Sequence, residues 1–160
     1  MSVVTDIVAT YRGPRRVIRR IIAAGPREDR ALAILMAGCA VVFVAQWPRL
    51  ARESHLTGGD LTMKLGGTLM AWLLIMPLVF YTLALLSHWL LRATGGTGEP
   101  FAARMALFWA LLASGPLILL WGLMAGFAGS GPGLTVVGVL WCFTFLWFWM
   151  SGLAEARRST

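Results

Sequence analysis

The stretch FAARMALFWALLASGPLILLWGLMAGF, residues 101–127, decides the fold of this chain. It is apolar, it carries no charge after Arg104, and Ser114-Gly115-Pro116 interrupts it at its centre. Roughly 17 to 25 mostly apolar residues cross a bilayer as a helix, and proline interrupts the helical hydrogen-bond ladder. The stretch therefore predicts a membrane-spanning helix with a kink.

The rest of the chain has the same apolar character. Hydrophobic residues make up 58% of the 160 residues and charged residues 13%, whereas about 25% of an ordinary soluble domain is charged. The first 30 residues are the most polar part, and four long apolar runs follow them, so we expect no cleaved signal peptide. The predicted fold class is all-α, a polytopic membrane helix bundle with four transmembrane helices.

The four spans are expected at about residues 31–47, 65–91, 104–127 and 134–153. They make up a membrane domain over residues 31–153, which follows an interfacial segment over residues 1–30 and precedes a tail over residues 154–160. Pro48 is expected to end the first span, because proline cannot donate to the helical ladder. Residues 48–66, which hold most of the polar side chains between the first two spans, then form a loop.

The basic residues predict the orientation of the bundle. Four spans place both termini on one side, which carries eleven basic residues against three on the other side. Because cytoplasmic loops carry the excess of Lys and Arg, both termini are expected in the cytoplasm. The chain has thirteen arginines, one lysine and no asparagine, a bias typical of a bacterial genome rich in G and C. These features predict a protein of the bacterial inner membrane.

The N-terminal segment holds a basic amphipathic helix. Its isoleucines and arginines fall on opposite sides at helical spacing, and Gly13-Pro14 precedes them. The segment is too short and too charged to span, so we expect it on the bilayer surface, where anionic phospholipid head groups contribute about 1 kcal/mol per basic residue. The candidate lipid-binding residues are Arg15, Arg16, Arg19, Arg20, Ile18, Ile21 and Ile22. A solvated tail is the alternative.

Two prolines and two glycines stand out within the spans. Pro77 and Pro116 each lie near the middle of a long span and are expected to kink it. The two kinked spans either frame a cleft or use the prolines only for packing. Gly122 and Gly126 form a G-x-x-x-G pattern that lets helices approach closely, within the bundle or between copies.

No catalytic, cofactor or metal site is expected. All seven acidic residues lie outside the spans or at their ends, which argues against ion-coupled transport. Cys39 and Cys142 fall inside apolar runs and are expected to be reduced packing residues. Ser130 and His88 are predicted on opposite sides of the membrane, so they cannot act as nucleophile and base. The net charge of +7 is explained by topology, and no nucleic-acid partner is expected because cations and aromatic residues are not interleaved.

The chain resembles the short bacterial members of the Yip-domain family of small polytopic membrane proteins. The matching features are Gly13-Pro14-Arg15-Arg16, the segment REDRALAILM at the start of the first span, and the proline-centred ALLASGPLILL of the third; Tyr11 before Gly13-Pro14 is similar to a Tyr-Gly-Pro motif of eukaryotic members. Family members commonly have five spans, whereas four are counted here. The resemblance implies an integral-membrane scaffold and no catalytic residue.

The first functional hypothesis is a non-enzymatic membrane scaffold that binds lipid, a membrane-protein partner or another copy of itself. A second hypothesis is a small permease or flippase component with a cleft between the two kinked spans. A third is an accessory subunit of a larger membrane complex.

Overall fold

The computed structural model of the chain describes residues 2–158, so residue 1 of the predicted interfacial segment and residues 159–160 of the predicted tail lie outside the described part. All regular elements in residues 2–158 are helical. They are α1 (Val3–Arg12), α2 (Pro14–Ala23), α3 (Glu28–Thr57), α4 (Leu61–Met70), the π-helical segment η1 (Ala71–Ile75), α5 (Met76–Ala93), α6 (Pro100–Ala113), α7 (Gly115–Phe127) and α8 (Pro132–Ala156). Within this range, three continuous helices are long and apolar enough to cross a membrane, and the bent pair α6–α7 makes a fourth if it counts as one span. The chain is an all-helical, membrane-associated protein.

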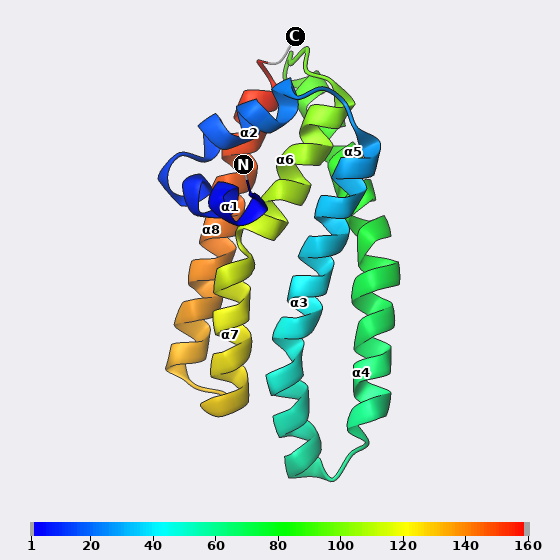
Figure 1. The fold of residues 1–160 in the computed structure, drawn as a ribbon, viewed down its shortest axis with the longest axis vertical. Helices are drawn as coiled ribbons and strands as arrows, with labels where there is room; N and C mark the ends of the chain where they lie inside the picture. The colour runs from blue at the N-terminus through cyan, green and yellow to red at the C-terminus, as the bar shows by residue number, and fades with distance from the viewer. Residues whose placement is uncertain (1, 159–160) are drawn as a thin grey trace.

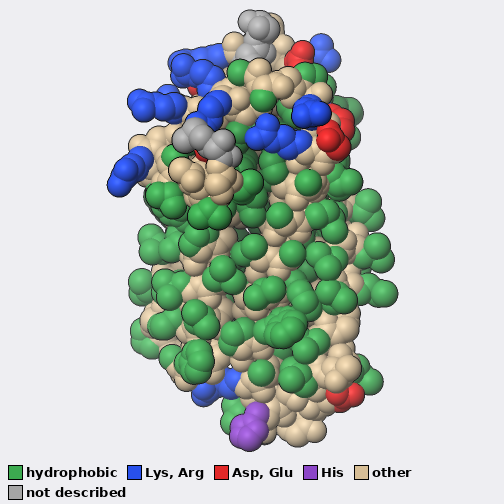
Figure 2. Space-filling view, viewed as in Figure 1, with side chains coloured by type: hydrophobic (Ala, Val, Ile, Leu, Met, Phe, Trp, Pro, Cys, Tyr) green, Lys and Arg blue, Asp and Glu red, His purple; other side chains and the backbone are tan. Residues whose placement is uncertain are grey.

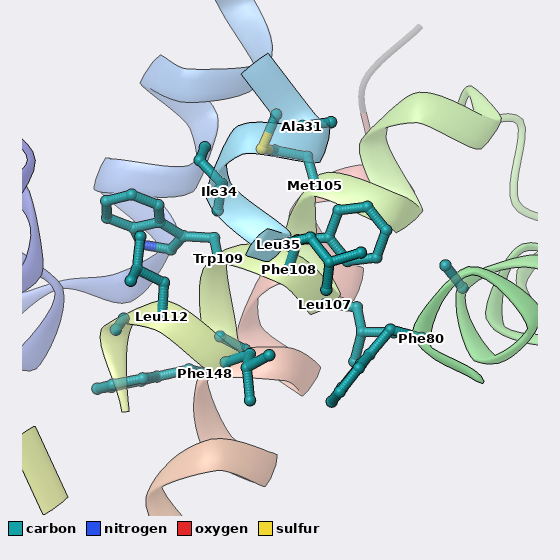
Figure 3. Close-up of a cluster of buried hydrophobic side chains, with 14 of the residues drawn as sticks. Ala31, Ile34, Leu35, Phe80, Met105, Leu107, Phe108, Trp109, Leu112 and Phe148 are labelled. Carbon is teal, nitrogen blue, oxygen red and sulfur yellow. The ribbon is translucent and has the colours of Figure 1, made fainter. Parts of the chain in front are cut away.

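Helix α6 lies at the centre of one half of the bundle (Figure 1). All its residues except Pro100 and Arg104 are buried. Helices α3, α5 and α8 pack around it, together with α1 and α2. Figure 3 shows side chains of α6 packed with side chains of α3, α5 and α8, among them Met105, Phe108, Trp109, Leu35, Phe80 and Phe148. A helix that is apolar on every side is expected to be buried on every side or to face lipid, and α6 is buried in protein.

The apolar stretch of residues 101–127 breaks at its centre. Helix α6 ends at Ala113, α7 begins at Gly115, and the two are bent by 41°. Pro116 lies in the first turn of α7, where its missing N–H leaves no helical bond unmade. The Ser114 hydroxyl donates to the carbonyl of Leu111 at 3.0 Å and accepts from Trp141 Nε1 at 3.2 Å. Ser114 therefore links the break between α6 and α7 to α8 through a hydrogen bond.

The first long helix does not end at Pro48, which corrects the prediction of a loop over residues 48–66. Helix α3 continues through Pro48 to Thr57. Gly58 ends it with a φ of +67°, and the Asp60 carboxylate accepts from the Thr62 N–H at 2.8 Å at the start of α4. Proline is tolerated inside membrane helices where a neighbouring helix compensates, and Pro48 packs against Gly126 of α7. Gly58 as the C-terminal cap of α3 and Asp60 as the N-terminal cap of α4 were the sequence signals for the turn between these helices.

The second long helix is continuous from Leu61 to Ala93 and contains the π-helical segment η1 just before Pro77. It starts earlier than the predicted residue 65. A π-helical turn is a common way to accommodate an interruption of the hydrogen-bond ladder. Pro77 follows this wide turn directly and is buried.

Helix α7 lies against α3 through Gly122 and Gly126. A Cβ atom added at Gly122 would stand 1.9 Å from the carbonyl oxygen of Ala45, and one added at Gly126 would stand 2.3 Å from Cβ of Pro48. The two backbones therefore approach as closely as only glycine permits. The G-x-x-x-G pattern serves a contact inside the bundle.

Alanine at Gly122 is expected to destabilise the bundle, because its methyl group forces the α3 backbone away and such overpacking costs about 1 to 3 kcal/mol. Gly66→Ala in α4 is the matched control, because a Cβ there meets nothing within 4 Å and alanine favours the helix by about 1 kcal/mol. Thermal unfolding of the purified proteins should show a lower midpoint for Gly122→Ala and an unchanged or higher one for Gly66→Ala. Equal midpoints would contradict the proposed close contact.

Candidate functional site

Charged side chains gather at the two ends of the molecule and leave a broad apolar belt between them (Figure 2). The end that holds α2 and the close of α8 carries most of the arginine side chains. The other end holds the turn between α3 and α4, where Lys64 Nζ lies 2.8 Å from Glu53 Oε1. An apolar belt between two polar ends is the pattern of a protein that spans a bilayer. We call the arginine-rich end the basic end.

Helices α1 and α2 form a cap on the basic end. They are joined at Gly13, and Pro14 starts α2. The apolar face of α2 packs on α8 and α6, so Ile18 and Ile21 are only 2% and 3% exposed. Ile22 is half-buried against the same core. Ile18 and Ile21, expected from the sequence to bind lipid, are instead surrounded by apolar side chains of the protein itself.

Buried hydrogen bonds fasten the cap to the central helix. Trp109 Nε1 of α6 donates to the Thr10 hydroxyl at 3.0 Å, and that hydroxyl donates to the backbone carbonyl of Asp6 at 2.7 Å. Thr10 is fully buried, so the loss of either bond would leave an unsatisfied polar group. Tyr11 packs edge-on against Phe148 of α8, and burial raises the pKa of its hydroxyl.

The four arginines of α2 are not equivalent. Arg19 Nε donates to Glu155 Oε1 of α8 at 2.6 Å. Arg20 pairs with the carboxylate of Asp6 in α1. Arg15 and Arg16 are exposed. Two of the four candidate lipid-binding arginines therefore hold the cap in place, and the other two face outward.

The spans that contain Pro77 and Pro116 touch directly, because α5 packs on α6. Helix α3 lies between α7 and the α4–η1 segment (Figure 1) and packs on both. An apolar groove of about 740 Å³ opens beside α8, and its lining includes Val42 and Gln46 of α3, Trp72 of η1 and Trp121 of α7. Neither Pro77 nor Pro116 lines it. The prolines shape the helices, and the groove is a separate feature.

His88 lies in a small cavity of about 290 Å³ between α5 and the start of α6. It is buried, and its Nδ1 atom has no hydrogen-bond partner. Arg104 lines the same cavity and pairs with Glu28 at the start of α3. This ion pair joins the beginning of α3 to α6, and sequence reasoning missed it because the two residues lie far apart in the chain.

Arg52 supports the opposite end of the bundle. Its Nη1 atom donates to the carbonyls of Gly126 and Phe127 at 3.2 and 3.1 Å. These are carbonyls of the last turn of α7, which has no helical donors left for them. Arg52 therefore caps α7 from α3, a role that no local pattern in the sequence indicates.

Cys39 is buried in the core and Cys142 is exposed on α8, and the two thiols are free. Within residues 2–158, no group of three or more His, Cys, Asp or Glu side chains is placed to hold a metal ion. The arrangement of the described residues is that of packed helices with ion pairs at their ends.

Comparisons of the chain with protein-family models, with curated proteins and with solved structures found no match.

Thr10→Val is expected to loosen the cap, because it leaves the buried Trp109 N–H without its acceptor at a cost of about 1 to 3 kcal/mol. The protein should then be cut by trypsin within α2 at least about fivefold faster, since local opening exposes the backbone. Thr5→Val on the exposed side of α1 is the control and should be cut at the wild-type rate. Equal rates for wild type and Thr10→Val would show that this bond does not hold the cap.

Proposed function

We propose that this chain is a non-enzymatic, multi-pass protein of the bacterial inner membrane that acts as a scaffold by binding a partner membrane helix. It has four spans, with α6 and α7 together forming the third, and both termini in the cytoplasm. The cap then lies on the cytoplasmic face, with Arg15 and Arg16 toward the anionic head groups. The resemblance to the Yip-domain family remains a prediction consistent with this role.

The distribution of charge supports this orientation. The basic end holds the arginines of the cap and those after α8, and positive charge marks the cytoplasmic side of membrane proteins. The length of α7 supports counting it together with α6 as one span, because α7 alone has only 13 residues, fewer than the roughly 17 that a bilayer needs.

The observation that carries the proposed binding role is an open apolar stripe on α8. In its most apolar window, α8 has only 6% of its residues buried, against 39% for α3. One face is occupied, because Trp141, Phe145 and Trp149 follow each other with ring centroids 5.8 and 6.0 Å apart and pack on the core. The open stripe consists of Val136, Val139, Phe143, Leu146 and Met150.

The spacing of this stripe suits another helix. Its members alternate three and four residues apart, which is the repeat of helices that pack side by side with a left-handed crossing. Phe143, at the centre, is 75% exposed. A partner helix or a second copy of this chain would bury the stripe, and an accessory role in a larger complex would use the same surface. The permease hypothesis gains no comparable support, because neither Pro77 nor Pro116 lines the apolar groove beside α8.

A photo-crosslinking amino acid at Phe143 tests the scaffold role. Irradiation of intact membranes should give a protein adduct of discrete mass, either a partner or a dimer of this chain, because the stripe is in contact with another helix. The same amino acid at Met70 on the exposed side of α4 is the control and should label lipid. The proposal would be contradicted if both positions gave lipid adducts and no protein adduct. Native mass spectrometry after gentle extraction would then give a single chain without a partner.

Reporter fusions test the orientation. A fusion after Gly96 should report the cytoplasm, and fusions after Gly58 and Gly131 should report the opposite side, because four spans alternate across the bilayer. A cytoplasmic signal after Gly58 would contradict the proposed topology. A cytoplasmic signal after Gly131 alone would show that α6 and α7 do not form one span.

A further inference from the structure

A second groove lies between α5 and α8 at the basic end of the bundle. Its volume is about 790 Å³. Helices α5 and α8 both pack on α6, and Leu91 of α5 and Trp149 of α8 both contact a cluster that includes Ala103 and Ala106 of α6. These alanines carry the smallest apolar side chains, so α6 separates the two walls without filling the space between them.

The lining of this groove changes character along its length. Most of it is apolar and comes from Leu83, Leu86, Leu90, Trp149, Met150 and Leu153. Both helices run in the same direction here, and both walls end in polar residues, Thr94 on α5 and Arg157 and Arg158 after α8. From Leu83 to Thr94 the helix rises about 16 Å, which is close to the depth of one leaflet, half of the roughly 30 Å hydrocarbon core.

The polar mouth of the groove carries uncompensated positive charge. Arg157 Nη2 donates to the carbonyl of Thr94 at 2.8 Å, so the guanidinium reaches from α8 to the end of α5. No carboxylate lines the groove. The nearest acidic residue along α8, Glu155, is buried and already paired with Arg19. Within residues 2–158, neither Arg157 nor Arg158 has a carboxylate partner.

We propose that this groove binds one anionic phospholipid, with an acyl chain along the apolar walls and the phosphate on Arg157 and Arg158. Arginine bonds phosphate through a planar fork of N–H donors, and the guanidinium of Arg157 keeps donors free beyond its bond to Thr94. The cytoplasmic leaflet supplies anionic lipid. The site differs from the cap arginines, of which Arg19 and Arg20 are engaged in ion pairs. It rests on the proposed function only in that the basic end must face the cytoplasmic leaflet.

Native mass spectrometry of the full chain, extracted from membranes and exposed to matched lipids, tests this site. The probes are phosphatidylglycerol and phosphatidylcholine with the same acyl chains, and soluble glycerol phosphate. Wild type should retain phosphatidylglycerol over phosphatidylcholine, because the choline group neutralises the charge of the phosphate in the second lipid. R157Q/R158Q should lose about thirtyfold of that preference, since each arginine contributes about 1 kcal/mol of attraction to a net anionic head group. R158Q alone should lose part of the preference for phosphatidylglycerol. Because Arg158 is exposed, this single variant keeps the test informative if the double variant misfolds.

Two further variants separate the site from general charge effects. R27Q/R30Q removes the same charge from exposed positions at the start of α3 and should keep the wild-type preference. Ala154→Phe fills the groove while both arginines stay in the chain, and it should reduce retention of both lipids. Equal retention of the two lipids by wild type, or equal losses in the two double variants, would overturn the site, and binding of glycerol phosphate as tight as that of the lipid would replace it by a free phosphate site. A chain that is absent from membranes would instead refute the proposed function.

Discussion

The burial of α6 on every side is the constraint on which the basic half of the molecule depends. Two glycines on its neighbours make this burial possible: a Cβ at Gly38 of α3 would stand 3.0 Å from Leu111 Cδ2, and one at Gly152 of α8 would stand 2.7 Å from Ala106 Cβ. A glycine on the neighbouring helix at each contact lets three helices surround one. The cap then covers the side that these helices leave open, so its position follows from α6 and not from a lipid surface.

Beyond the bend at Ser114 the molecule is organised differently. Helix α7 packs on α3 and α8, while most of α4, η1 and the lower part of α8 present their apolar side chains outward. A bilayer provides no hydrophobic driving force for helices to associate, so contacts there depend on close packing. The Gly122 and Gly126 contact with α3 is of that kind, and the exposed stripe of α8 lacks a counterpart within the chain. The core at the basic end holds the fold together, and the other half leaves much of its apolar surface exposed.

The sequence predicts the apolar helices well and their surroundings poorly. Helices α6 and α8 are both strongly apolar, yet α6 is buried in protein and the most apolar window of α8 is largely open, because hydropathy does not distinguish a protein interior from lipid. Residue size distinguishes the two helices, because α6 is rich in alanine and α8 is rich in aromatic residues. The amphipathic pattern of α2 was recognised correctly as a helix, but the same pattern suits a membrane surface and a protein surface equally. The prediction that Pro48 ends the first span was wrong, because the helix continues through this proline where it packs against α7. No local sequence pattern reveals that contact.

The ion pairs of the cap determine which cations remain free for lipid. Glu155 lies two residues before Arg157 and would be an obvious partner for the arginines at the end of α8, but it pairs with Arg19 across the cap. Asp6 is taken by Arg20 in the same way. These two ion pairs occupy the carboxylates of Asp6 and Glu155. Within residues 2–158, Arg157 and Arg158 are left without a carboxylate partner at the mouth of the apolar groove. The carboxylates of α1 and α8 therefore pair with Arg20 and Arg19 of α2. Arg15 and Arg16 of α2 stay exposed, as do Arg157 and Arg158 at the end of α8.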